Sequence, residues 1–256
     1  SKSKKIVPTT IEFVDIAGLV KGAAEGEGLG NKFLSHIREV DAIAQVVRAF
    51  EDPNIIHVSN RVNPKEDSDI VNLELVLADS DTVRKRLSNA KRDARGKGDE
   101  KIKTEIELLE RVAAQLEAGK AARELSFTEE EMRVMKELQL LTMKPIMYVV
   151  NVDEISDFRF QISDFNANAI VYVCAKLEAE LAELSPDEAK EYMRELGMAQ
   201  SGLDKIIVAG YQLLNLVTFL TSGEPETRAW TVKAGTLAPD AAGVIHTDFA
   251  KKFIKA

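Results

Sequence analysis

Residues 13–43 read FVDIAGLVKGAAEGEGLGNKFLSHIREVDAI, and the order of residue types in this stretch decides the fold. The β-branched segment 6–16 predicts a strand, and Asp15 and Gly18 lie where that strand should end. A glycine there allows a ligand to approach the backbone closely. More glycines follow before a helical pattern begins, so the loop has the freedom to reorganise around a bound group. The stretch therefore predicts a strand, a binding loop and a helix in succession.

Three more short apolar segments predict buried strands, at residues 42–50, 145–150 and 170–173. Helical patterns separate these segments, which is typical of a parallel sheet in an α/β domain. Polar residues follow each segment directly. Because parallel strands end at one edge of their sheet, we expect these polar residues to form a single site.

Short motifs follow three of the predicted strands in a fixed order. They are DxxG, NxxE and [SC]AK, formed by Asp15 and Gly18, by Asn151, Val152 and Glu154, and by Cys174, Ala175 and Lys176. In P-loop hydrolases the Asp belongs to the Mg²⁺ shell, and the Gly N–H reaches the γ-phosphate. DxxG alone is a weak signal, because a strand-terminal Asp before a turn has the same pattern. The ordered combination is more specific and predicts a nucleotide site.

Several segments resemble the YchF group, the Obg-like ATPases of the translation-factor-related P-loop hydrolases. These segments are the stretch quoted above, IIHVSNRVNP (55–64), NVDE (151–154) and AWTVKAGTLAPDAAGVIHTDF (229–249). The resemblance implies an α/β fold of the P-loop NTPase type with a mostly parallel sheet. It also implies an α-helical coiled-coil insertion, a C-terminal β-rich, β-grasp-like TGS module, and the activity of a ribosome-associated ATPase.

Residue patterns divide the chain along the same lines. We predict a nucleotide-binding domain from residues 1–72 and 144–215. Helical spacing on both sides of a polar stretch predicts two antiparallel helices within the insertion 73–143. Turn residues and β-branched residues from 216 to 256 predict the small β-rich module.

The sequence departs from the pattern of the family in three ways. It contains no GxxxxGK[ST] loop, the interval between Asn151 and Cys174 is short for a helix between strands, and the last module ends early. These departures predict that residues are missing from the sequence. A chain of this extent is expected to be inactive, because the backbone cradle and the lysine of the P-loop bind the phosphates.

Two residues are expected to bear on hydrolysis. Leu19 takes the position after Gly18 where Ras-like enzymes have a water-positioning Gln, and a leucine cannot hydrogen-bond water. The resemblance implies that His57 has a catalytic role. An imidazole can donate or accept a hydrogen bond near neutral pH, so His57 is expected to help position the water. The alternatives are that Leu19 only packs under the loop and that His57 is an ordinary loop residue.

The base-reading motif differs from the NKxD of GTPases. Val152 replaces the lysine, and Glu154 replaces the final Asp that accepts hydrogen bonds from guanine. The longer Glu side chain need not reach the same position, and the resemblance implies the same shift towards adenine. We therefore expect ATP to be preferred over GTP, with Asn151 still at the base. The alternative is a guanine site of relaxed geometry.

A local excess of positive charge lies around the middle of the insertion. Residues 84–103 carry nine Lys or Arg against three Asp or Glu, in a chain of net charge -8. Phosphate groups require such charge, whereas a solvated helix tip has the same composition. The candidate RNA-binding residues are Arg84, Lys85, Arg86, Lys91, Arg92 and Lys97.

Composition limits the other possibilities. One cysteine excludes an intramolecular disulfide framework, and no apolar run has membrane-spanning length, so we expect a cytoplasmic protein without a membrane partner. Mg²⁺ is the expected cofactor, held through water by Asp15, and K⁺ is a second candidate. The expected partners are ATP and the ribosome, on its large subunit and rRNA. A GTPase of the Obg type and a non-catalytic ribosome or RNA adaptor are the alternatives.

Overall fold

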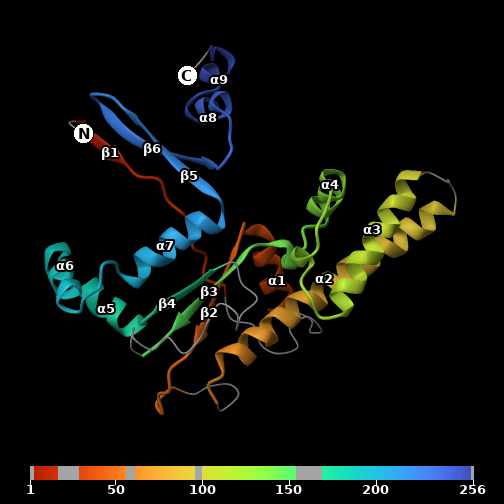
Figure 1. Ribbon diagram of the computed structural model, residues 1–256, viewed down its shortest axis with the longest axis horizontal. Coiled ribbons are helices and arrows are strands. Elements are labelled where there is room, and N and C mark those ends of the chain that lie inside the picture. The colour runs from red at the N-terminus through yellow and green to blue at the C-terminus, as the bar shows by residue number, and fades with distance from the viewer. Residues whose placement is uncertain (1–2, 17–28, 56–60, 96–99, 154–168, 255–256) are drawn as a thin grey trace. The chain divides into compact units, whose positions relative to one another are not determined.

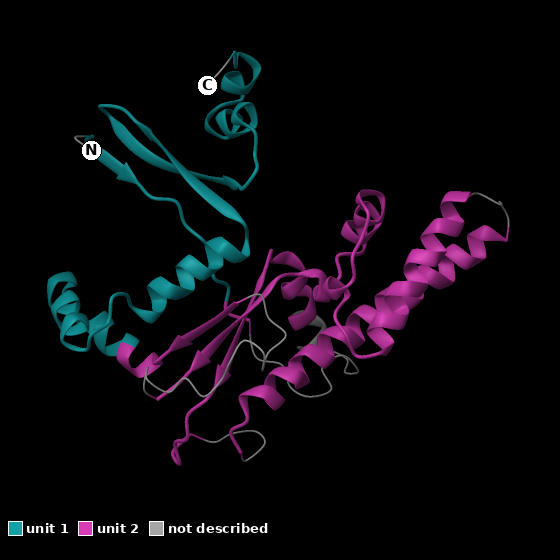
Figure 2. Ribbon diagram, in the orientation of Figure 1, with its two compact units in different colours: residues 1–14, 178–256 teal, residues 15–177 magenta. Residues whose placement is uncertain are grey.

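The computed structural model describes residues 3–16, 29–55, 61–95, 100–153 and 169–254 (Figure 1). The chain forms two compact units (Figure 2). Residues 15–177 make up one unit, and residues 1–14 combine with residues 178–256 in the other. Among the described residues, no helix has both the length and the apolar character needed to cross a membrane.

A parallel three-stranded sheet lies at the centre of the unit 15–177. Its strands follow the order β2 (Ile43–Arg48), β3 (Ile146–Asn151) and β4 (Ala169–Val173). Tyr148 and Val150 of the central strand are fully buried in one apolar cluster with residues of both neighbouring strands. The α/β class and the three apolar strands predicted from the sequence are therefore confirmed.

Two long helices, α2 (Pro64–Ala94) and α3 (Glu100–Glu117), pack side by side as a helical hairpin (Figure 1). Apolar side chains three or four residues apart on each helix form its core; they are Val76, Val83, Leu87, Ala90, Ile106, Leu109, Val112, Ala113 and Leu116. α2 begins well before residue 73, because the Asn63 side chain caps its first turn by accepting a hydrogen bond from the Glu66 N–H. The predicted insertion thus starts within a helix.

Short elements connect the hairpin to the sheet. They are η1 (Ala122–Glu124), α4 (Glu129–Leu138) and η2 (Leu141–Met143), whereas α1 (Leu29–Glu39) precedes β2. Thr128 and Glu131 form a capping box at the start of α4. α4 ends at Leu138, because Gln139 adopts a left-handed backbone conformation with φ 47°.

The second unit contains a mixed sheet in the order β1 (Lys5–Val7), β6 (Glu226–Lys233) and β5 (Leu216–Ser222). β1 runs parallel to β6, and β5 and β6 form an antiparallel hairpin. The prediction of one strand over residues 6–16 is therefore wrong: the strand is short and belongs to this sheet. Pro8 follows it directly, and a proline has no N–H to continue the ladder.

Helices account for the rest of this unit. They are α5 (Ala175–Glu183), whose first residues belong to the other unit, α6 (Pro186–Glu195), α7 (Gly202–Leu213), α8 (Ala238–Ile245) and α9 (Thr247–Lys251). The expectation that strands and turns alone fill residues 216–256 is thus wrong in part. Pro239 lies in the first turn of α8, where a missing N–H costs nothing, and two alanines follow it. The predicted module boundary at residue 216 stays a prediction.

Candidate nucleotide site at the strand ends

The carboxyl ends of β2, β3 and β4 lie in one row. Arg48 pairs with Asn151, which pairs in turn with Val173. Backbone hydrogen bonds continue beyond the strands, from the Ala49 N–H to the Asn151 carbonyl at 2.8 Å and from the Val152 N–H to the Val173 carbonyl at 2.9 Å. The predicted gathering of polar residues at one sheet edge is therefore present for the NxxE and [SC]AK motifs.

A side-chain hydrogen bond joins these two motifs directly. The Asn151 Oδ1 accepts a hydrogen bond from the Ala175 N–H at 3.1 Å, at the start of α5. This bond fixes the plane of the Asn151 amide group and therefore the direction of its Nδ2 donors. The N-terminus of α5 and the end of β3 are thus joined at one corner of the sheet.

Two other motif residues, which neighbour Asn151 and Ala175 in the sequence, are buried. Val152 is 2% exposed and packs in the apolar cluster of the sheet. Cys174 is buried, and its thiol donates a hydrogen bond to the Asp153 carbonyl at 3.1 Å. Ala175 and Lys176 are exposed at the surface. The side chains of Val152 and Cys174 therefore hold residues 152 and 153, which directly follow β3, against the sheet.

Of the two residues that define the DxxG motif, the structure describes only Asp15. Asp15 is exposed and lies in the irregular segment 8–16, so the prediction that it ends a buried strand is wrong. Its neighbour Ile16 packs against the cluster that contains Leu34 and Ile37 of α1, and all three residues belong to the unit 15–177. Four other predicted site residues lie outside the described residues: Gly18, Leu19, His57 and Glu154.

Arg48 is a positioning residue that sequence reasoning missed. At the end of β2, its guanidinium donates hydrogen bonds to the carbonyls of Phe50 (2.9 Å), Ile55 (2.9 Å) and Asp52 (3.2 Å). It also lies over the Phe50 ring, 4.7 Å from the centroid. These contacts hold the loop that leads to His57. The available signal was a cation at the end of an otherwise apolar strand.

A buried carboxylate, Asp79 of α2, connects the hairpin to the sheet. It accepts hydrogen bonds from the Leu141 N–H (2.9 Å), the Thr142 N–H (2.7 Å) and the Thr142 hydroxyl (2.6 Å). Burial raises the pKa of Asp79 above its ordinary value, and the hydrogen bonds from Thr142 and Leu141 oppose that shift. Nearby, the Lys144 ammonium donates to the carbonyls of Arg38 and Val40 at the end of α1.

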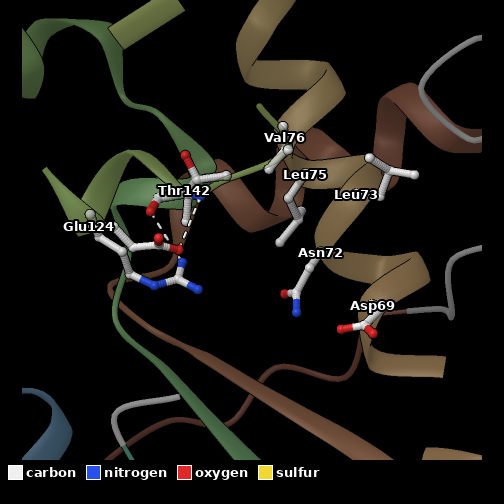
Figure 3. A pocket seen from close by; sticks show the side chains of 10 residues that line it. Asp69, Asn72, Leu73, Leu75, Val76, Glu124 and Thr142 are labelled. Atoms are coloured by element: carbon white, nitrogen blue, oxygen red, sulfur yellow. Dashed lines mark hydrogen bonds between the residues drawn. The ribbon is translucent and has the colours of Figure 1, made fainter. Parts of the chain in front are cut away.

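A pocket of about 320 Å³ lies next to this carboxylate, at the base of the hairpin (Figure 3). Arg123 lines it and donates a hydrogen bond to the Thr142 carbonyl at 3.1 Å, while burial lowers the pKa of Arg123. Asn72 also lines the pocket and donates to the Tyr148 hydroxyl of β3 at 2.7 Å. The Asn72–Tyr148 hydrogen bond thus joins α2 to β3, and the Arg123–Thr142 hydrogen bond joins η1 to η2.

The predicted RNA-binding cations lie along α2. Arg84, Lys85, Arg86, Lys91 and Arg92 are all exposed, and Lys97 lies outside the described residues. Three of the five described cations form ion pairs with carboxylates, so they are not equivalent.

Known proteins share both the sequence and the fold of this chain. Residues 216–256 match the YchF-GTPase_C family, described as "Protein of unknown function (DUF933)", and residues 2–79 match the family described as "50S ribosome-binding GTPase". The "Ribosome-binding ATPase YchF" of Bacillus subtilis is 52% identical, over 99% of this chain and 72% of the relative. The protein of the same name from Escherichia coli O157:H7 is 48% identical, over 100% of this chain and 72% of the relative.

A solved structure agrees with these matches. The Schizosaccharomyces pombe YchF GTPase superposes with a TM-score of 0.85 at 39% identity, and the match covers 99% of this chain and 71% of that one. High identity over nearly the whole chain, with the same fold, confirms the resemblance noted in the sequence. The chain therefore belongs to the YchF family and has the α/β fold of P-loop nucleotide hydrolases.

Proposed function

We propose that this chain is the greater part of a ribosome-associated nucleoside triphosphatase that hydrolyses ATP in preference to GTP. The hydrogen bond between Asn151 and Ala175 supports this proposal most directly, because it joins two base-reading motifs at one sheet edge. The relatives carry the name of ribosome-binding ATPases, which supports the ribosome as partner. We extend the proposal to the large subunit and its rRNA, and to a cytoplasmic location.

We infer the preference for adenine because the motif lacks the lysine and the final aspartate of the guanine-binding pattern NKxD. Guanine selection in related sites needs an aspartate at the fourth motif position, where this chain has the longer Glu154, and a lysine stem over the base. Here Val152 takes the position of that lysine and is buried in the sheet, so it offers no stem to cover a base. Each lost bidentate contact with a base edge costs about 1–3 kcal/mol, which is enough to abolish a preference for GTP.

Mg²⁺ fits the proposed chemistry through Asp15. Nucleotide-bound Mg²⁺ keeps several waters and takes few protein ligands besides the phosphates, so one exposed carboxylate is sufficient. The described residues hold no cluster of three or more His, Cys, Asp or Glu side chains that could bind a metal ion. When bound, Mg²⁺ would neutralise charge on the phosphates. K⁺ stays an expectation without an assigned ligand.

Water activation is assigned to His57 as a proposal. The loop that leads to it is held by Arg48 as far as the Ile55 carbonyl, so His57 follows an anchored segment. Leu19 cannot orient water, and His57 supplies the missing hydrogen bond in this scheme.

Titrations of the full-length protein with ATP and with GTP, each with Mg²⁺, test the nucleotide assignment. We expect ATP to bind more tightly than GTP. We expect Asn151→Ala to weaken nucleotide binding about tenfold or more, because the variant loses both the proposed hydrogen bond to the base and the hydrogen bond to the Ala175 N–H. Asn89→Ala, on the exposed surface of α2, is the matched control and should bind as the wild type does. Clearly tighter binding of GTP would overturn the assignment.

A further inference from the structure

The cations of α2 fall into two groups according to their partners. Arg84 contacts Glu117 at 3.1 Å, and Lys91 contacts Glu110 at 2.7 Å, both on α3. Arg86 contacts Glu105 of α3 at 2.6 Å and Glu137 of α4 at 3.8 Å. These three cations therefore neutralise carboxylates of neighbouring helices and stabilise the packing of the hairpin.

Lys85 and Arg92 form the second group. Each lies two residues after a core residue, Val83 or Ala90, and two residues turn an α-helix by about 200°. Both side chains consequently point away from the hairpin core, and both residues are exposed. Within the described part of the chain neither contacts a carboxylate, and Arg92 donates a hydrogen bond only to the neutral Asn89 Oδ1, at 3.2 Å. The outward face of α2 thus carries charge that is not neutralised.

The spacing of this pair suits a nucleic-acid backbone. Residues seven apart are two helical turns, about 10 Å, from each other along α2, so the two cations can contact two different phosphates. The residues between them on this face, Ser88 and Asn89, are small and polar. A protein partner is typically held by buried aromatic or apolar anchors, and this face has none among its described residues.

We propose that Lys85 and Arg92 form a phosphate-binding face of α2 that contacts rRNA, and that Arg84, Arg86 and Lys91 do not take part. This inference rests on the proposed ribosome association and divides the five described residues among those that the sequence marked as equivalent. An ion-paired cation has little net charge to offer a phosphate, and releasing it would leave a carboxylate on α3 facing the RNA.

Two double variants of equal charge test the division. Lys85→Gln with Arg92→Gln removes the unpaired cations, and Arg84→Gln with Lys91→Gln removes two paired cations from the same helix. Each is assayed in the full-length protein by co-sedimentation with large ribosomal subunits, and by fluorescence anisotropy with an RNA duplex of mixed sequence, over a range of KCl concentrations.

We expect the first variant to bind about tenfold more weakly, and the magnitude of its log–log salt slope to fall by about two, because two phosphate contacts are lost. The second variant should keep the wild-type slope, and its hairpin should lose little stability, because exposed ion pairs contribute little. Equal losses in both variants, or no loss in either, would overturn the division. Loss of subunit binding without loss of duplex binding would overturn the RNA assignment and indicate a ribosomal protein. Wild-type binding to subunits tests the proposed function separately.

Discussion

Asp79 shows how one buried residue connects distant parts of the unit 15–177. Its carboxylate is 1% exposed and accepts three hydrogen bonds from η2. η2 leads directly into β3, and β3 ends at Asn151. The same turn is bonded to α1 through Lys144. A change at Asp79 should therefore affect both the hairpin and the hydrogen-bonded corner of Asn151 and Ala175.

Replacing Asp79 with Asn should destabilise the protein. The Asn side chain keeps one acceptor oxygen, but its NH₂ group would face the donors of Thr142, leaving buried groups unsatisfied at a cost of about 1–3 kcal/mol. Urea unfolding at neutral pH measures the free energy of unfolding directly. Asp81→Asn, an exposed carboxylate on the same helix, is the control and should change it little.

The pH dependence of this effect has a definite sign. Because the folded-state pKa of Asp79 is raised above its ordinary value of 3.8, the folded state binds the proton more tightly than the unfolded state. The contribution of this residue to stability is therefore fully present below pH 3.8 and falls as pH rises through the raised folded pKa. The deficit of Asp79→Asn should accordingly shrink from acid to neutral pH. A deficit that grows with pH would show that the folded pKa is lowered.

The helical hairpin is the element that depends most on its own core. Leu109 and Val112 are fully buried in the cluster shared by α2, α3 and their connections. Cross-helix ion pairs flank this core, but they are largely exposed and each contributes little. Apolar packing should therefore decide whether the hairpin is folded.

Leu109→Ala should destabilise the hairpin by about 2–5 kcal/mol, because it removes buried methyl groups and leaves a cavity. Amide hydrogen exchange read by mass spectrometry should show faster exchange along α2 and α3. Leu77→Ala, at a site that is 41% exposed on α2, is the matched control with a much smaller expected effect. Equal effects of the two variants would mean that the hairpin core contributes little.

At the scale of the whole molecule, periodicity predicted most elements. The spacing of apolar residues indicated the long helices, and short apolar runs indicated β2, β3 and β4. β1 could not be placed in the same way. It has three residues, and its partner β6 lies far away in sequence, so no local pattern reports the pairing.

The positions of candidate site residues could be predicted from the sequence where they belong to short motifs next to a predicted strand. Asn151, Cys174 and Ala175 lie at the strand ends that their motifs indicated. The sequence patterns did not predict the roles of Arg48, Asp79 and the ion pairs of α2, because these roles depend on partners outside their own elements. A sequence shows that a residue is charged, but only the folded packing shows whether that charge is already neutralised.

The pairing of β1 with β6 should be necessary for the sheet of the second unit. In Val7→Pro the pyrrolidine ring removes a backbone N–H next to the existing Pro8, and β1 should detach. We expect amide exchange to accelerate in β6 while β3 and α3 keep their protection, since they belong to the other unit. Val7→Thr, which retains β-branching and the N–H, is the control. Unchanged exchange in β6 would show that the β5–β6 hairpin is stable alone.

The strand pair at the two ends of the chain also has a consequence for synthesis. Thr9 and Thr231 share a hydrogen bond but are 222 residues apart, so the first strand is made roughly 10 to 45 s before its partner. During that interval β1 has no partner strand, so its edge stays unpaired in the growing polypeptide. Lys4 and Lys5 precede Ile6 and Val7, and charges beside an unpaired strand discourage aggregation. We therefore expect Lys4 and Lys5 to limit aggregation of this strand during translation.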